Sequence, residues 1–171
     1  MPVYAKDFEP IAKPSENVCI IGAEGKGNTK YYKIVAIESL PFYEHDFGAV
    51  NAGQTLKDQE VKALYLNARQ LAQYRIRLVD DVELQLKQPK SDTKFTTKSG
   101  EFKISRDIAG TDFTNLTEFF VFEDQSILFN VTNPSASNIS SSKVQFAGFK
   151  YILKELDKEP DKYTTVIVEA Q

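Results

Sequence analysis

The first segment with a recognisable chemical motif is rich in glycine and follows a short apolar run. Residues 22–29 read Gly-Ala-Glu-Gly-Lys-Gly-Asn-Thr, a spacing close to that of a phosphate-binding loop. Asn28 stands where that loop has the lysine that contacts the β- and γ-phosphates, so the principal positive charge is absent. The motif also needs a following helix whose N-terminus meets the phosphate, whereas residues 31–37 are typical of a strand. We therefore interpret residues 22–29 as a glycine-rich hairpin loop.

Two acidic clusters could in principle hold a metal ion. Residues 44–46 read Glu-His-Asp, and imidazole with carboxylates suits several divalent ions. In a strand, however, the two carboxylates face one side and the imidazole faces the other, which favours a solvated loop or edge. Asp80, Asp81 and Glu83 lack the Asp-x-Asp-x-Asp-Gly spacing of a calcium loop and suit turn and surface positions. We predict no metal site and no cofactor, with cation binding at these acids as the open alternative.

Side chains that usually carry reactive chemistry are scarce. The 171 residues include one His, one Cys, one Met and no Trp. This excludes an internal disulfide and a structural zinc site, and a Ser-His-Asp or Cys-His mechanism would have to use His45. Cys19 lies in an apolar run and is typical of an inert core residue. Among 24 acidic residues some pair of carboxylates is inevitable, so such a pair does not support assignment as a glycosidase. We predict that the protein is not an enzyme.

Charge and hydropathy limit the possible partners. The net charge of -3 is too small for a phosphate-binding field across the surface, so nucleic acid is an unlikely ligand. Hydrophobic residues make up 42% of the chain, enough for an ordinary core in one domain. No apolar run approaches the ~20 residues that span a bilayer, and the first 18 residues lack the apolar stretch of a signal peptide. We expect no contact with a membrane.

The elements that must position these residues are mostly strands, because apolar residues recur with a period of two from Asn17 onward. The expected strands are residues 18–21, 31–37, 74–79, 82–87, 116–122, 127–131, 144–153 and 163–168. Turns are expected at Asp80-Asp81, as a hairpin, and at residues 123–125. Short strands separated by Gly, Pro, Asn and Ser predict a mainly β protein, an antiparallel β-sandwich or jelly roll with at most one or two short helices.

Three segments depart from this pattern. Residues 60–72 fit a helix and a strand equally well, and residues 154–157 could form one helical turn before Pro160. Residues 1–16 contain three prolines and little periodicity, which predicts an extended N-terminal arm that could dock on a neighbour. The remaining residues, 17–171, then form a single β-sandwich domain, with residues 93–100 as a long surface loop.

Aromatic residues are abundant, with 12 Phe and 8 Tyr. Core packing and subunit interfaces both use large aromatic area and explain most of them. Exposed rings can also form a sugar-binding platform, although Trp, the usual choice for that role, is absent. Tyr31, Tyr32, Phe42 and Tyr43 are the candidates for an interface or a ligand platform, so carbohydrate is a possible partner.

Several stretches resemble the strands of small β-sandwich structural proteins of tailed-bacteriophage virions. They are Thr117-Glu-Phe-Phe-Val-Phe-Glu-Asp, Phe129-Asn-Val-Thr-Asn-Pro-Ser, Val144-Gln-Phe-Ala-Gly-Phe-Lys-Tyr-Ile-Leu and Tyr74-Arg-Ile-Arg-Leu-Val-Asp-Asp-Val-Glu-Leu, about a third of the chain. The resemblance implies a capsid, neck or tail component that forms a homo-oligomer and contacts other virion proteins. Its location would be the virion, and the host cytoplasm before assembly. The alternative is a carbohydrate- or receptor-binding β-sandwich module.

Overall fold

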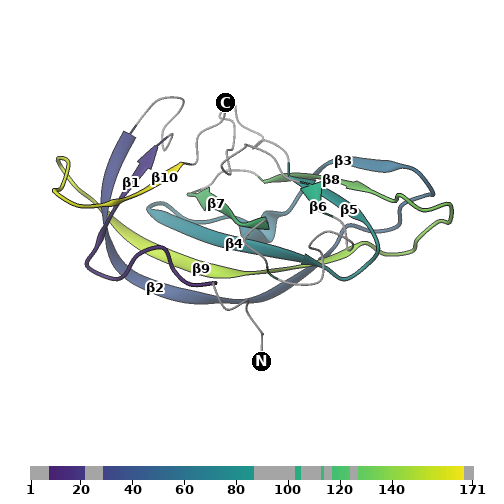
Figure 1. The fold of residues 1–171 in the computed structure, drawn as a ribbon, viewed down its shortest axis with the longest axis horizontal. Coiled ribbons are helices and arrows are strands. Elements are labelled where there is room, and N and C mark those ends of the chain that lie inside the picture. Colours follow the sequence, from purple (N-terminus) through teal and green to yellow (C-terminus); the bar gives the residue numbers. More distant parts are fainter. Residues whose placement is uncertain are drawn as a thin grey trace.

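A computed structural model describes residues 8–21, 29–86, 103–104, 113, 117–123 and 127–167. Within them, ten strands form two sheets (Figure 1). The six-stranded sheet has the order β10 (Thr164–Ile167), β1 (Asn17–Ile21), β2 (Thr29–Asp46), β9 (Lys143–Glu155), β4 (Gln70–Leu78), β7 (Phe119–Phe122). The four-stranded sheet has the order β3 (Thr55–Glu60), β8 (Leu128–Thr132), β5 (Glu83–Leu86), β6 (Lys103–Ile104). The prediction of a mainly β sandwich is confirmed, and the pair formed by β1 and β10 is parallel.

Two long strands, β2 and β9, run through the six-stranded sheet and curve along one side of the molecule (Figure 1). Their antiparallel pairing extends from Tyr32 opposite Glu155 to Asp46 opposite Lys143. The register shifts twice, the second time between Leu40 and Tyr43, and such bulges bend a strand and increase its twist. The long strands extend beyond the four-stranded sheet (Figure 1), where β1 pairs with the start of β2 and β10 pairs with β1.

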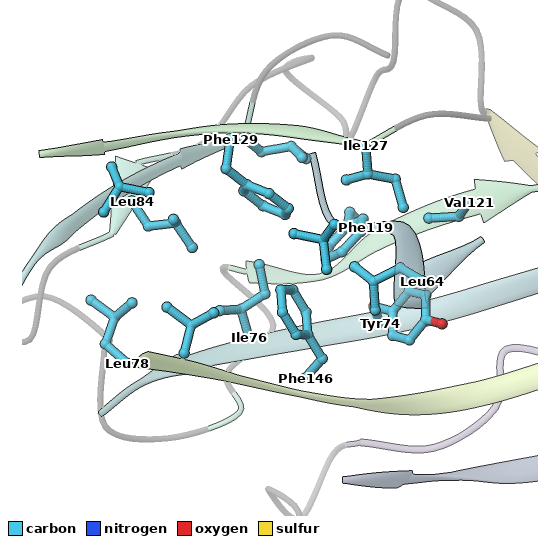
Figure 2. Close-up of a cluster of buried hydrophobic side chains, with 14 of the residues drawn as sticks. Leu64, Tyr74, Ile76, Leu78, Leu84, Phe119, Val121, Ile127, Phe129 and Phe146 are labelled. Atoms are coloured by element: carbon cyan, nitrogen blue, oxygen red, sulfur yellow. The ribbon is translucent and has the colours of Figure 1, made fainter. Parts of the chain in front are cut away.

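The main core lies between the two sheets. Figure 2 shows Phe129 and Ile127 pointing from one side toward Ile76 and Phe146 on the other. The rings of Phe129 and Phe146 lie 5.9 Å apart between centroids, a spacing typical of favourable aromatic pairs. All four of these side chains are almost completely buried, as expected for the inner faces of a sandwich.

A second core lies on the opposite face of the six-stranded sheet. Side chains alternate between the faces of a strand, and on β4 Ala72 and Ile76 belong to the main core whereas Leu71 belongs to the second one. Phe8 and Phe113 complete the second core. The larger sheet is therefore buried on both faces, by the smaller sheet on one side and by segments outside the strands on the other.

The two expected turns connect different sheets. Residues 80–81 lie between β4 and β5, and these strands belong to the larger and the smaller sheet, so the predicted hairpin is wrong. Asp80 instead accepts hydrogen bonds from the hydroxyl of Ser141 (2.9 Å) and the amide of Lys143 (2.7 Å) at the start of β9. Residues 123–125 likewise lie between strands of different sheets, β7 and β8. Local turn chemistry does not reveal such crossings, because a tight turn and a sheet-to-sheet corner use the same residue types.

Residues 60–72 form neither a continuous helix nor a continuous strand. The strand β3 ends at Glu60, one 3-10 turn spans Lys62–Leu64, and β4 begins at Gln70. The predicted helical turn at residues 154–157 is wrong, because β9 continues to Glu155 through its pairing with β2. The predicted surface loop at residues 93–100 lies outside the described residues. The described part of the chain has no helix that is both long and apolar enough to cross a membrane.

Candidate docking site for the N-terminal segment

The N-terminal segment, defined here as residues 8–16, lies against the six-stranded sheet. At its end the amide of Ser15 donates to the carbonyl of Ile34 (2.8 Å), and the amide of Ile34 donates to the carbonyl of Glu16 (2.9 Å). Phe8 and Ala12 are 4% and 7% exposed and belong to the second core. Part of the expected arm therefore packs on the sheet of the same chain.

Polar side chains of the sheet bind the backbone of this segment. The amide of Ile11 donates to the Tyr151 hydroxyl (2.8 Å), which donates to Oε1 of Gln73 (2.6 Å). The side-chain amide of Gln73 donates to the carbonyl of Glu9 (3.0 Å) and to Oε2 of Glu118 (3.1 Å). Gln73 is 1% exposed, and a buried amide is tolerated where its hydrogen-bonding groups have partners.

Arg75 links this network to the aromatic rings around it. Its Nε lies 3.0 Å from Oε2 of Glu118 and its Nη1 lies 3.2 Å from the carbonyl oxygen of Phe113. The guanidinium carbon also lies 4.4 Å from the centre of the Phe8 ring, and Phe8 packs edge-to-face on Phe149 at 5.1 Å. Arg75 is 3% exposed, so its carboxylate partner and these contacts together offset the cost of burying its charge.

The hydroxyl of Tyr151 stays protonated in this setting. Burial is the main cause that raises the pKa of Tyr151, the Glu118 carboxylate adds to it, and the hydrogen bond from the amide of Ile11 opposes it. A protonated hydroxyl both accepts from Ile11 and donates to Gln73. We call the four side chains of Gln73, Arg75, Glu118 and Tyr151 the acceptor network, because together they receive the N-terminal segment. Its donors and acceptors suit the backbone of an extended peptide, with an aromatic anchor at Phe8.

The structure does not bring the predicted platform residues together. Tyr32 is 2% exposed in the second core, where its ring packs on Phe122 at 5.6 Å. Phe42 is partly buried against the same core, whereas Tyr43 is partly buried against the main core between the sheets. Only Tyr31 faces the surface with a second tyrosine. The four residues therefore occupy several environments, because neighbouring side chains of a strand point to opposite faces.

Tyr31 belongs to a surface cluster with Tyr163 and Glu159. The two rings pack edge-to-face with centroids 5.3 Å apart, and their hydroxyls donate to the two carboxylate oxygens of Glu159 at 3.2 and 3.1 Å. Burial and then the charge of Glu159 raise the pKa of Tyr31 to about 12. Cys19 is buried beside this cluster, and burial raises the pKa of its thiol. The interpretation of Cys19 as an inert core residue agrees with that environment.

The Glu-His-Asp triplet has structural partners at the end of β2. Nδ1 of His45 lies 3.1 Å from the Tyr43 hydroxyl, and burial lowers the pKa of His45 although the charge of Asp46 opposes this. Oδ1 of Asp46 accepts from the amides of Gly48 (2.8 Å) and Ser142 (2.9 Å). Among the described residues, no three His, Cys, Asp or Glu side chains are placed to hold a metal ion.

Replacing Asp46 with alanine should lower the free energy of unfolding by about 1 kcal/mol near neutral pH, because two backbone amides lose their acceptor. Those hydrogen bonds lower the pKa of Asp46 below its ordinary 3.8. The stabilisation is therefore complete above that value and is lost as the pH falls through the lower pKa of the folded protein. Urea unfolding at about pH 6 and about pH 3 measures it.

The control for this prediction is Asp46→Asn, which keeps an acceptor oxygen but does not titrate. The stability advantage of the natural protein over Asp46→Asn should shrink between the two pH values. An advantage that is the same at both would contradict the assignment.

The acceptor network was not predicted from the sequence. Gln73 and Arg75 alternate with apolar residues on β4, the pattern of a strand with one solvated face. The feature of the sequence that could have indicated it is Tyr151 in a densely apolar strand, since a buried Tyr hydroxyl usually has a hydrogen-bond partner. Comparison of the chain with protein-family models finds no match, and comparison with curated proteins finds none either.

Proposed function

We propose that the protein is a structural virion component, part of a capsid, neck or tail, that works by self-association and by docking to other subunits. The observation that carries the proposal is the way the N-terminal segment is held. Side chains of the sheet bind its backbone at Glu9 and Ile11, and its Phe8 ring contacts both Phe149 and Arg75. These are the contacts of peptide recognition, with main-chain hydrogen bonds and an aromatic anchor.

Such a site suits assembly because a second copy of the chain carries the same segment. The acceptor network can bind the segment of its own chain or that of a neighbour through identical contacts, and exchange of an identical element is a low-cost route to oligomers. A buried polar network is not needed for stability alone, since apolar packing of the same volume is often at least as stable. The network therefore favours an extended segment that presents these backbone groups and an aromatic anchor over apolar surface in general.

The strand order offers further surfaces for assembly. Within the described part of the chain, β10 and β7 form the edges of the larger sheet, and β3 and β6 form those of the smaller one. Edge strands present backbone donors and acceptors that a neighbour can pair. The site for the N-terminal segment and the edge strands both support a protein that functions by associating with other subunits.

The mass of the full chain tests this proposal. We expect native mass spectrometry and mass photometry to show a defined oligomer, and we expect deletion of residues 2–14 to reduce the oligomer's mass while far-UV circular dichroism keeps its β signal. Lys13→Ala serves as the matched control, because the Lys13 side chain is exposed and this variant should assemble like the natural protein. A persistent monomer, or an oligomer that the deletion leaves unchanged, would overturn the proposal.

A further inference from the structure

A groove of about 350 Å³ lies where the start of β1 meets the start of β10. Two hydrogen-bonded segments from opposite ends of the chain form its walls. The side-chain amide of Asn17 donates to the carbonyl of Lys162 (3.2 Å), and Val18 pairs with Thr164 in the parallel ladder. These contacts join the two segments that line the groove. Its lining residues are Ser15, Glu16, Asn17, Lys162, Tyr163 and Thr164.

One of the lining residues, Tyr163, carries a ring that its neighbours hold in place. Tyr163 is 39% exposed, yet its ring is fixed by the edge-to-face contact with Tyr31 and by the hydrogen bond of its hydroxyl to Glu159. A tyrosine offers large contact area at low conformational-entropy cost, and here its surface contacts lower that cost further. The lining thus combines one positioned tyrosine with five polar side chains, which suits a ligand that is itself polar.

We propose that this groove binds a neutral saccharide. Sugar hydroxyls both donate and accept hydrogen bonds, and the lining supplies acceptors at Glu16, donors at Lys162 and Asn17, and hydroxyls at Ser15 and Thr164. The single acidic and the single basic side chain balance, so the lining favours neither an anion nor a cation. The apolar face of a sugar ring would then lie on Tyr163. None of the four side chains of the acceptor network lines this groove, which shares only Ser15 and Glu16 with the end of the N-terminal segment.

An array of neutral and acidic glycans probed with the full chain tests the proposal. We expect binding to neutral glycans, and the strongest of them is then used for titration. Tyr163→Ala should weaken that binding about tenfold. The matched control is Val35→Ala, which truncates another exposed side chain, on β2 at 57% exposure, and this variant should bind within about twofold of the natural protein.

A second measurement uses the natural protein and does not depend on how a variant folds. Titration with the same glycan, followed by amide chemical shifts, should give changes concentrated at residues 15–17 and 162–164. No neutral glycan above background, binding confined to acidic glycans, an unchanged affinity in Tyr163→Ala, or shift changes centred elsewhere would each overturn the proposal.

Discussion

Replacing Gly148 with alanine is expected to lower the free energy of unfolding by about 3 kcal/mol or more. Gly148 lies in β9 opposite Tyr74 of β4. A Cβ atom at this position would overlap the carbonyl oxygen of Gln73 and would lie 3.0 Å from its carbonyl carbon and 3.2 Å from the Cα of Tyr74. All of these atoms belong to the backbone, so no side-chain rotation can relieve the overlap. Packed cores on both faces of the sheet also resist a shift of either strand.

Gly53→Ala is the control. Its cost should come from backbone conformation, whereas the cost of Gly148→Ala should come from lack of space. Gly53 has a φ of +70°, and no atom lies within 4 Å of the position that a Cβ would take. Its replacement should therefore cost only about 1 kcal/mol, the penalty for an L residue in the left-handed region. Urea unfolding followed by tyrosine fluorescence and circular dichroism measures both variants. Equal costs for the two would contradict the close approach of β4 to Gly148.

Replacing Glu118 with alanine is expected to lower the free energy of unfolding by about 3 kcal/mol. Its Oε2 accepts from Nε of Arg75 at 3.0 Å and from the side-chain amide of Gln73 at 3.1 Å. The variant leaves the guanidinium of Arg75, whose side chain is 4% exposed, without that carboxylate. Water can reach the site in part, because the Glu118 side chain is 22% exposed, which places the cost at the lower end of the range for a broken buried pair.

The same variant should also loosen the N-terminal segment. Gln73 and Arg75 contact both Glu118 and that segment, so the amide of Ile11 should exchange its hydrogen faster in Glu118→Ala. Circular dichroism should still report a β fold. Unchanged exchange at Ile11 would show that the segment is held independently of the carboxylate.

Two further variants isolate the ionic part of the effect. Glu38→Ala removes a surface partner of Lys150, a pair at 3.5 Å in which Glu38 is 58% exposed, and should cost less than about 1 kcal/mol. The double variant Arg75→Met with Glu118→Met should be less destabilised than Glu118→Ala, because it leaves neither charge behind. Glu118→Ala costing no more than Glu38→Ala would contradict the assigned role of the buried pair.

The positions of several strands could be predicted from the sequence, because the alternation that marks a strand is a local property. The apolar run at residues 18–21 lies in β1, and the stretch at residues 144–153 lies within β9. The phosphate-loop interpretation could be set aside for the same reason, since residues 31–37 lie in β2 where that motif requires a helix.

Which strands pair depended on contacts far apart in the chain. Residues 74–78 and 83–86 are neighbours in sequence and look like the two arms of a hairpin, yet they belong to different sheets. The strand β4 pairs instead with β9 and β7, each more than 40 residues away. Pairing over such distances is decided by which faces can be buried together, and a local pattern carries no information about that.

From the residue pattern alone one can infer that the chain is mainly β, rich in aromatic residues and poor in groups for reactive chemistry. The covering of the larger sheet on both faces follows from contacts between distant segments and is visible only in the folded chain. Arg75 and Gln73 occupy positions that the pattern of β4 assigns to solvent, and they are buried because residues 8–12 and Phe113 lie over them. The Gln73 side chain meets the carbonyl of Glu9 across 64 positions of sequence. A side chain's environment is set by whatever packs on it, and strand periodicity describes only the strand itself.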